Sequence, residues 1–485
     1  MMVVTIPDLA FGYIIPEIII TVSAVIGLLL AAFGREKGGA AAGAVAFIGS
    51  GLATIFAFLL WDINASIFND LYTIDNFGTF FKGLSLIVSL LVTLLSLRYV
   101  EREGIIKGEY YALLLFGVLG MMIMVSSTHF ITIFIGLEVM SISIYILCGL
   151  LSGNRGSAEA SLKYFLLGAF ATAFLLYGMA LIYATTGILD IRDIARYITA
   201  GDFALTPMFM IGMALIIVGF GFKTASVPFH MWTPDVYEGA PTSITAYMAT
   251  GIKAAAFGAF LRVFYTAFAP FLISWSEMLW LIAVATMTLG NITALVQDDV
   301  KRMLAYSSIA HAGYILIAFV IGDQMSSASI LYYLLVYTFM NIGAFTIVIL
   351  LGRKGAENTG IEGYAGLAGR HPLLALSMSI FLLSLAGIPP LAGFMGKFYV
   401  LSAAVKAQYY WLAVIGVLNS VVAVYYYLRV IMAMYFKESS GESIRPDFSP
   451  AYSVVIVICV WALFHMGILP RDFLLIAQKS VGVFM

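Results

Sequence analysis

The stretch ITAYMATGIKAAAFGAFLRVF, residues 244–264, decides the class of fold. Apart from Lys253 and Arg262 it is uncharged, and it is long enough to cross a bilayer as a helix, which takes about 20 residues. Lys253 lies near the middle, where a charge costs roughly 2.5–3.5 kcal/mol on insertion scales. Such a costly residue indicates function, because ionisable groups inside membranes usually mark an ion or proton path.

The whole chain has the composition of a polytopic membrane protein. Of its 485 residues, 62% are hydrophobic and 11% are charged, whereas soluble domains carry about 25% charged residues. Mean hydropathy is +1.02, no long polar stretch could form a soluble domain, and the net charge of −1 offers no basic face for nucleic acid. We therefore predict an all-α membrane protein with a single membrane domain over residues 1–485.

Apolar runs between polar breaks predict about 14 membrane-spanning helices. The fourth and the fifth are separated only by the four residues 126–129, SSTH, so their boundary is the least secure. The expected spans are 10–33, 40–61, 78–98, 111–127, 129–151, 158–186, 206–230, 241–265, 275–296, 300–321, 326–351, 373–404, 408–436 and 450–469.

Lysine and arginine in the loops predict the orientation, because these residues concentrate on the cytoplasmic side of a membrane. With the N-terminus outside, the inner loops hold most of the loop lysines and arginines, among them Arg98, Arg102, Arg155, Arg302 and Arg370. We therefore expect a multi-pass protein of the cell membrane with both termini on the outer face. The loop at 231–240 is expected inside although it carries only the acidic residues Asp235 and Glu238.

A short repeat links the seventh and twelfth expected spans. Residues 219–223 read GFGFK and residues 393–397 read GFMGK, so both contain G-F-x-x-K. The offset of five spans is odd, hence the two copies cross the membrane in opposite directions, as in an inverted repeat. Pro228 lies near the first lysine, and Pro389 and Pro390 lie near the second. Proline interrupts a helix, so we expect helices 7 and 12 to be broken and to lie at a transport site.

Further ionisable residues lie inside expected spans, namely Glu138, Lys163, Lys223 and Lys397. Lys223 lies near a span end, and Lys163 lies nearer still. For both lysines, an alternative to a functional role is that the side chain snorkels to the membrane surface. Glu138 would be a helix-end carboxylate if its span began later. His230 and His311 could join a water chain, since imidazole titrates near neutral pH, or could be hydrogen-bonded packing residues. The other charges are interpreted as interface or structural residues: Glu17, Lys82, Arg262 and Arg429.

The sequence predicts no redox cofactor, metal or nucleotide site in this chain. Its two cysteines, Cys148 and Cys459, are too few to hold an iron–sulfur cluster, and no C-x-x-C is present. The five histidines include no H-x-x-x-H pair, and no G-x-x-x-x-G-K-[ST] loop occurs. Any redox energy would therefore have to come from partner subunits.

Three stretches resemble the antiporter-like subunits of respiratory complex I, and within that family most of all the N type. They are FIGLEVMSISIYIL (134–147), KTASVPFHMWTPDVYEGAPTSITAYMATGIKAAAF (223–257), and VKRMLAYSSIAHAGY (300–314) with LAGIPPLAGFMGKFYVL (385–401). The DVYEGAP segment within the second stretch favours the N type, and the sister M type usually has glutamate where Lys397 stands. The resemblance implies 14 helices and two inverted five-helix repeats, which we place at 111–265 (helices 4–8) and 275–436 (helices 9–13).

The resemblance also implies residue roles. Glu138 matches the family's fifth-helix glutamate, and Lys223 matches the seventh-helix lysine that is paired with it. Lys253 matches the central lysine of the eighth helix and Lys397 the lysine of the twelfth. Lys163 matches a sixth-helix lysine whose role is less certain. Together they would form a proton relay in the plane of the membrane.

By the same resemblance, the chain is expected to be a proton-translocating membrane-arm subunit of a dehydrogenase like complex I. Its implied partners are a neighbouring antiporter-like subunit M, the small subunit K and a peripheral arm that holds flavin and iron–sulfur clusters. The donor could be NADH or a reduced deazaflavin coenzyme, and the acceptor a quinone or methanophenazine. Two alternatives are a subunit of a multi-component sodium/proton antiporter, against which DVYEGAP argues, and an unrelated secondary transporter that works alone.

Overall fold

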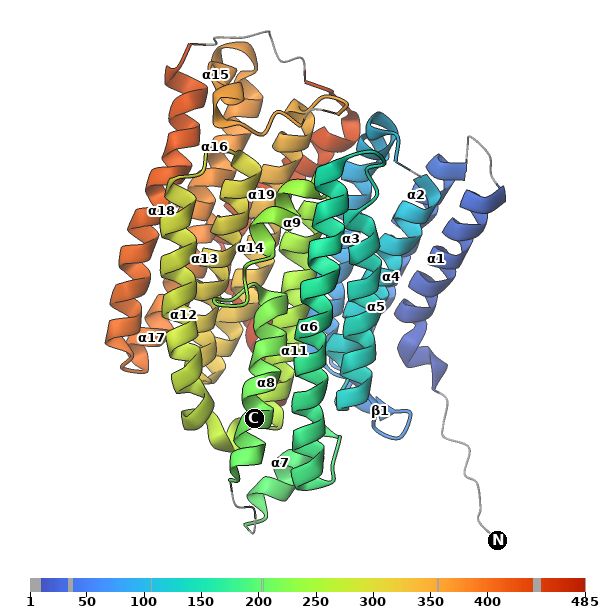
Figure 1. Ribbon diagram of the computed structural model, residues 1–485, viewed down its shortest axis with the longest axis vertical. Helices are drawn as coiled ribbons and strands as arrows, with labels where there is room; N and C mark the ends of the chain where they lie inside the picture. The colour runs from blue at the N-terminus through green and yellow to red at the C-terminus, as the bar shows by residue number, and fades with distance from the viewer. Residues whose placement is uncertain are drawn as a thin grey trace.

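The computed structural model describes residues 10–33, 38–105, 107–201, 203, 205–355, 357–438 and 446–484. Within them, thirteen helical segments are long and apolar enough to cross a membrane, and they form one bundle of roughly parallel helices (Figure 1). The elements that make up these segments are α1 (Ile15–Phe33), α2 (Gly38–Leu59), α3 (Asn76–Glu103), α4 (Lys107–Ser126), α5 (Phe130–Cys148), α6 (Arg155–Thr186), α8 (Pro207–Thr224), α10 (Thr242–Tyr247) with α11 (Lys253–Thr266), α12 (Leu272–Leu295), α13 (Val300–Ile321), α14 (Gln324–Leu351), α18 (Tyr410–Phe436) and α19 (Pro450–Ile468).

The expected break between the fourth and fifth spans is confirmed, and its cause is local. α4 ends at Ser126 and α5 begins at Phe130. The ring of His129 accepts a hydrogen bond from the amide of Ile131 at 3.3 Å and so caps the first turn of α5. Polar residues that satisfy free backbone groups therefore separate two helices that hydropathy alone barely resolves.

The two expected helix breaks are present, and the second of them explains why the described residues contain 13 long apolar helices where about 14 spans are expected. The seventh span ends early, because α8 stops at Thr224 and Ala225 takes a left-handed conformation (φ 61°), before the short helix α9 (Thr233–Gly239). The expected span 373–404 is two helices, α16 (Pro372–Ala386) and α17 (Ala392–Lys406). Gly387 caps α16 with φ 87°, a conformation that glycine adopts without steric cost.

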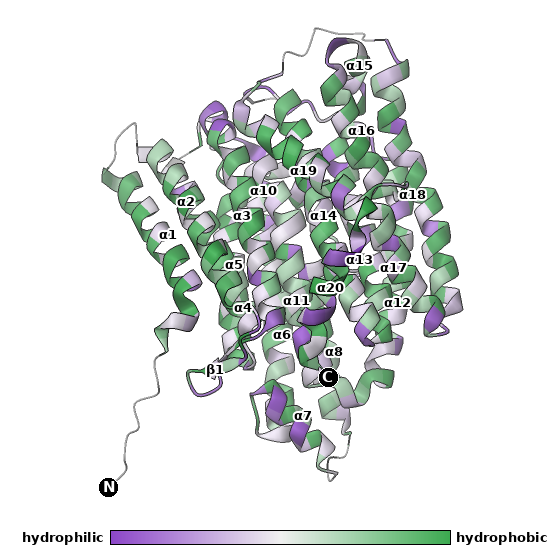
Figure 2. Ribbon diagram, turned by 180° about the vertical axis from the view of Figure 1, so that it is seen from behind, coloured by the Kyte–Doolittle hydropathy of each residue, from purple (hydrophilic) through white to green (hydrophobic). Residues whose placement is uncertain are grey.

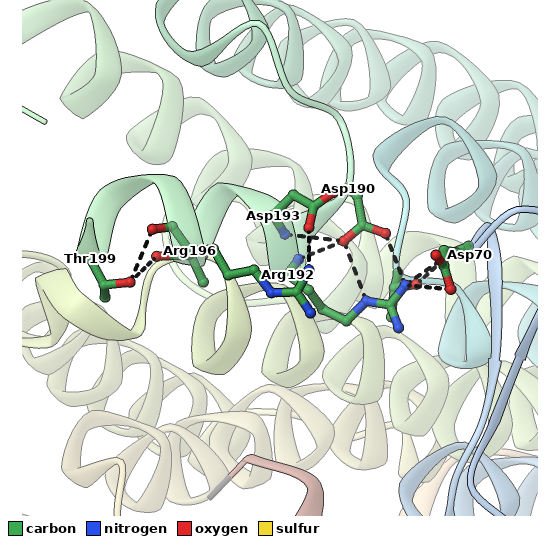
Figure 3. Close-up of polar contacts among 8 residues, drawn as sticks. Asp70, Asp190, Arg192, Asp193, Arg196 and Thr199 are labelled. Atoms are coloured by element: carbon green, nitrogen blue, oxygen red, sulfur yellow. Dashed lines mark hydrogen bonds and ion pairs between the residues drawn. The ribbon is translucent and has the colours of Figure 1, made fainter.

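Short elements lie at the two ends of the bundle (Figure 1), which we call the α7 face and the α15 face. The α7 face carries α7 (Ile191–Thr199) and an antiparallel hairpin of β1 (Ala65–Ile67) and β2 (Tyr72–Ile74), a small exception to the all-α prediction. The carboxylate of Asp190 caps α7, and the guanidinium of Arg192 returns to Asp190 and to Asp70 of the hairpin loop (Figure 3). The opposite face carries α15 (Leu367–Arg370), and α20 (Pro470–Val481) follows α19 and contacts α3 and α14.

The interior of the bundle is formed by α10–α11, α13 and α14. The most apolar stretch of Thr242–Thr266 is wholly buried inside the bundle. In Phe11–Phe33, only a third of the corresponding stretch is buried. The peripheral helices turn Ile, Leu and Phe side chains outward, and hydrophobic residues accordingly dominate the outside of the bundle (Figure 2). Because the innermost span is the one that carries Lys253, this lysine lies at the centre of the protein.

Candidate functional site

Lys253 begins α11 immediately after a single π-helical turn, Met248–Ile252. Such turns within α-helices are frequent at functional sites. Lys253 is 1% exposed, and its Nζ donates to the backbone carbonyl (2.7 Å) and to the hydroxyl of Ser308 on α13. Among the described residues, no carboxylate lies within ion-pair distance of this ammonium group.

Lys223 lies in the last turn of α8 and points into the bundle. It is 2% exposed, which rules out the alternative that it snorkels to the surface. Its Nζ donates to the hydroxyls of Ser141 (2.7 Å) and Tyr145 (3.3 Å) on α5 and lies 5.3 Å from the centre of the Tyr145 ring. The lysine is therefore held by hydroxyl groups and by aromatic faces, which attract cations.

Glu138 lies on α5, one helical turn before Ser141, and is half-buried. Its Oε1 is shielded from solvent and has no hydrogen-bond partner among the residues that the structure describes. Lys223 contacts Ser141 and Tyr145 rather than this carboxylate, so the ion pair expected between Glu138 and Lys223 is not formed in this arrangement. Glu138 thus has a free acceptor one turn away from the hydroxyl that holds the lysine.

Lys397 lies in α17, just beyond the break in the twelfth span, and is 5% exposed. Its Nζ donates to the carbonyl of Ala386, the last residue of α16 (2.9 Å), and to the hydroxyl of Ser420 on α18 (3.0 Å). Carbonyls at a helix C-terminus carry partial negative charge, so the broken helix itself supplies a site for the ammonium group. Lys397 also lines a mostly apolar cavity of about 670 Å³ between α16, α17 and α18.

A polar stripe on α13 connects the two lysines of the second half. Ser308, His311 and Tyr314 are three residues apart, so they lie on one face of the helix. Ser308 accepts from Lys253, and the ring of Tyr314 lies 4.8 Å from Nζ of Lys397. His311 is 1% exposed between them and shares hydrogen bonds with the hydroxyls of two tyrosines, Tyr333 (Nδ1, 2.7 Å) and Tyr427 (Nε2, 3.2 Å).

The other predicted histidine lies apart from this stripe. His230 is half-buried between α8 and α9, and no described residue forms a hydrogen bond with its Nδ1. In the described part of the chain, no hydrogen bond joins its side chain to Lys223, Lys253 or Lys397. Of the two histidines, the structure brings only His311 together with the lysines.

Lys163 belongs to a charged cluster at the α15 face. Its side chain is 35% exposed, and Nζ is ion-paired with Asp235 of α9. Arg302 of α13 approaches the same carboxylate at 2.9 Å and Glu238 at 2.5 Å. Burial alone would raise the pKa of Asp235, but hydrogen bonds from Lys163 and Arg302 outweigh it and lower that pKa. Lys163 thus differs from the other three lysines, because it has both a carboxylate partner and access to solvent.

This cluster predicts a pH-dependent contribution to stability. Because the pKa of Asp235 is lower in the folded protein, its stabilisation is complete above the unfolded pKa of about 3.9 and is lost as pH falls through the folded pKa. We expect Asp235→Asn to lower the melting temperature equally at pH 7 and pH 5, with the difference closing below about pH 4. Thermal unfolding of the purified protein followed by tryptophan fluorescence would measure this. The exposed Asp472 provides a control, Asp472→Asn; equal melting of both variants at pH 7 would contradict the prediction.

Two buried cations that the sequence suggested to be interface residues are instead paired inside the protein. Lys82 is 1% exposed, and its Nζ lies 2.9 Å from Glu17 of α1, which also accepts a hydrogen bond from Tyr72. Arg262 is 3% exposed and forms two parallel 2.8 Å hydrogen bonds with Asp75. Each partner comes from a segment far away in the sequence, so no local pattern could have revealed the pairs.

A third pair, Lys301 and Glu357, was not anticipated at all. Nζ of Lys301 lies 2.6 Å from Glu357 and donates to the carbonyl of Ala240, and Tyr99 donates to the same carboxylate at 2.7 Å. Burial alone would raise the pKa of Glu357, but Lys301 more than offsets it, so that this pKa is lowered. Glu357 lines a polar pocket of about 600 Å³ at the α15 face, together with Glu103, Asp235 and Arg302.

The bundle, its broken helices and its buried unpaired lysines define a membrane protein of the ion-translocating class. Residues 127–423 match the family described as "NADH:quinone oxidoreductase/Mrp antiporter, TM". A protein of Trichlorobacter lovleyi named NADH-quinone oxidoreductase subunit N is 49% identical over 471 residues, 96% of each chain. The chain therefore belongs to the family of these antiporter-like subunits.

Solved structures agree with this assignment. A chain of respiratory complex I from Thermus thermophilus, solved with aureothin, has 34% identity and a TM-score of 0.82, and the match covers 96% of this chain and all of that one. A chain of the Mrp complex from Dietzia shares the fold at 18% identity with a TM-score of 0.81, covering 97% of both. In the described residues, no group of three or more His, Cys, Asp and Glu side chains is placed to hold a metal ion.

Proposed function

We propose that this chain is the N-type, proton-translocating membrane-arm subunit of a complex I-like dehydrogenase and that its buried lysines carry the protons. One observation supports the proposal above all others. Lys82 and Lys301 are buried and paired with carboxylates, as stable burial of a charge requires. Lys223, Lys253 and Lys397 are as deeply buried, yet among the described residues they contact only neutral oxygens and aromatic rings. Groups so placed can give up and regain a proton without breaking an ion pair.

We propose an order for the relay from the contacts that each lysine makes. Glu138 would act on Lys223 through α5, and Lys253 would exchange protons with Lys397 along Ser308, His311 and Tyr314. Lys163, exposed and ion-paired, would be an accessory at the α15 face. Moving one charge across a membrane potential of 100 mV costs about 2.3 kcal/mol, and partner subunits would have to supply this energy from electron transfer.

Backbone hydrogen bonds support the proposed inverted repeats at 111–265 and 275–436. Where α5 begins, the amide of Phe130 donates to the carbonyl of Leu189 at 3.0 Å. Where α13 begins, the amide of Val300 donates to Thr359 at 2.7 Å. A second bond accompanies each, from Ile191 to Thr128 and from Ile361 to Asp298, with the same sequence spacing. Helices 5 and 10 of the two proposed repeats thus start with the same junction on opposite faces.

The helix breaks support the same symmetry but change its register. A left-handed residue caps α8 at Ala225 and α16 at Gly387, and a proline follows three residues later in both. Relative to these caps, Lys223 lies two residues before and Lys397 ten residues after. The two G-F-x-x-K strings therefore do not occupy equivalent places, and the position that corresponds to Lys397 is held by Asp235.

The proposed partners are an antiporter-like subunit M, the small subunit K and a peripheral arm with flavin and iron–sulfur clusters. Support comes from the relative named NADH-quinone oxidoreductase subunit N and from the complex I structure. A donor of NADH and a quinone acceptor fit that name, and a reduced deazaflavin with methanophenazine is the second possibility. We propose that both termini lie on the outer side of the cell membrane, with the α7 face outside.

Lys223→Met in the assembled complex tests the relay. We expect the rate of proton pumping to fall about tenfold, which corresponds to a barrier higher by about 1.4 kcal/mol, while electron transfer continues more slowly or uncoupled. Vesicles with a pH-sensitive dye inside would report proton uptake during donor oxidation. Lys437→Met, at an exposed lysine after α18, serves as the control.

A wild-type ratio of protons to electrons in Lys223→Met would remove this lysine from the relay. A sodium/proton antiporter remains the second candidate, on the basis of the shared fold of the Mrp chain. That candidate predicts sodium-driven proton flux without an electron donor, and the same vesicles would reveal it.

A further inference from the structure

α3 carries a row of buried polar side chains along one face. Lys82, Ser85, Ser89, Thr93 and Ser96 recur three or four residues apart, the spacing that aligns side chains on a helix. All five are at most 1% exposed. At 1.5 Å per residue the row rises about 21 Å, through most of an apolar layer about 30 Å thick. We call this row the α3 file.

Hydrogen bonds extend the file to the α15 face. The hydroxyl of Ser96 lies 2.7 Å from that of Tyr110 on α4, which donates to Ser243 of α10 at 2.8 Å. Tyr99, about one turn beyond Ser96, donates to Glu357 at 2.7 Å. Because Glu357 lines the polar pocket of about 600 Å³, this end of the file is adjacent to a space that water can enter.

The other end of the file reaches the α7 face. Nζ of Lys82 lies 2.9 Å from Oε1 of Glu17, and the hydroxyl of Tyr72 donates to the same oxygen at 2.5 Å. Thr73, the next residue of β2, lines a second polar pocket of about 570 Å³ together with Asp75 and Arg192, which is labelled in Figure 3. A carboxylate thus lies at each end of the file: Glu357 lines the first pocket, and Glu17 accepts from Tyr72, whose neighbour Thr73 lines the second.

Two buried atoms of this route have no hydrogen-bond partner in the described part of the chain. They are Oγ1 of Thr93, in the middle of the file, and Oε2 of Glu17, at its end. Buried polar atoms are almost always bonded to protein or to ordered water. Side chains one turn apart are separated by about 5–6 Å, a gap that one water bridges with two hydrogen bonds of about 2.8 Å. The free atoms therefore point to water molecules between the hydroxyls.

The file lies on a different side of α3 from the central lysine. Phe81 packs against Gly258 of α11, and Val88 packs against Gly251 of the π-helical turn that precedes α11. Both lie about 100° around the helix from the file. Ser89 instead shares a 2.8 Å hydrogen bond with Ser50 of α2. The file therefore faces α1, α2 and α4, and it does not pass through the contacts of Lys253.

We propose that the α3 file holds a chain of ordered waters that conducts protons across the membrane between Glu357 and Glu17, as a second path beside the lysine relay. A proton that leaves the last water of the chain bonds to Oε2 of Glu17, the oxygen without a partner. Lys82 and Tyr72 keep Oε1 in place during this transfer. Release of the proton from Glu17 to the pocket at the α7 face completes the crossing. The inference deepens the proposed function, because it adds a transverse path to the same proton pump.

Thr93→Val tests the file with little risk to folding, because valine keeps the shape of threonine and no protein hydrogen bond is lost. We expect proton pumping by the assembled complex to slow about tenfold, measured with a pH-sensitive dye inside proteoliposomes during donor oxidation. Thr172→Val is the matched control, since Thr172 of α6 also has a buried hydroxyl without a partner but lies outside the file. A cryo-EM map of the complex should show water density between Ser89 and Ser96.

Support requires both results, namely slower pumping in Thr93→Val than in Thr172→Val and water beside Thr93 in the map. Equal pumping by the two variants, or a dry file, overturns the proposal. Lys253→Met, measured in parallel, separates the two paths. If Lys253→Met abolishes pumping and Thr93→Val does not change it, the proposal of a water chain along the α3 file is overturned while the lysine relay stands. If neither variant changes pumping, both proposals are overturned.

Discussion

Lys253→Met is expected to abolish coupled proton pumping while leaving the protein at least as stable as before. The change removes the ammonium group at the centre of the bundle, so Ser308 loses its donor and the path towards His311 is interrupted. We expect pumping to fall by at least about tenfold. An unpaired charge at mid-membrane costs roughly 2.5–3.5 kcal/mol, so methionine should raise the free energy of unfolding by about 2 kcal/mol. Dye-based pumping assays and thermal unfolding of the same preparation would measure both effects.

The two readouts separate function from structure. Replacing a lysine that holds the fold together would lower the stability of the protein. Replacing a relay lysine would lower only the rate of proton pumping. Lys437→Met, at the exposed position after α18, should change neither. A stable Lys253→Met protein that pumps at the wild-type ratio would contradict the relay at its central member, and an unstable one would mean that Lys253 holds the fold together.

Asp75→Asn is expected to have the largest effect on stability, about 3–5 kcal/mol, because it leaves a buried charge without a partner. Asp75 is 4% exposed, and its carboxylate accepts two hydrogen bonds from Arg262 while capping α3 at the amide of Gly78 (2.6 Å). Asparagine can still cap the helix, so the loss should report the ion pair. Denaturant titration in detergent and the yield of assembled complex would show it.

The same substitution at a surface pair is the control. Asp193 and Arg196 of α7 lie 2.7 Å apart with side chains 52% and 78% exposed (Figure 3), and exposed pairs contribute little. Asp193→Asn should therefore cost at most about 0.5 kcal/mol. If both variants were equally stable, the buried pair would not anchor α3 to α11.

Several features could be predicted from sequence because they are local properties of the chain. The helical breaks near Pro228 and Pro390 follow from the missing amide donor of proline, and the polar residues at 126–129 separate α4 from α5. The G-F-x-x-K strings were less informative. They correctly drew attention to two broken helices, but Lys223 lies before its break and Lys397 after it, a difference that becomes apparent only when the caps are compared.

From the amino-acid sequence, the protein is expected to cross the membrane as a bundle of helices, and a few of its charges are too costly to be accidental. Length and hydropathy suffice for that, since each span must satisfy its own backbone hydrogen bonds. Which of the buried charges are paired becomes apparent only from the packing of the helices. Lys82 pairs with Glu17 and Lys301 pairs with Glu357 across long stretches of chain, while Lys253 donates hydrogen bonds to Ser308. The distance between a lysine and the nearest carboxylate depends on how the helices pack. Stabilising lysines and proton-carrying lysines therefore look alike in the sequence and are distinguished by their contacts in the folded protein.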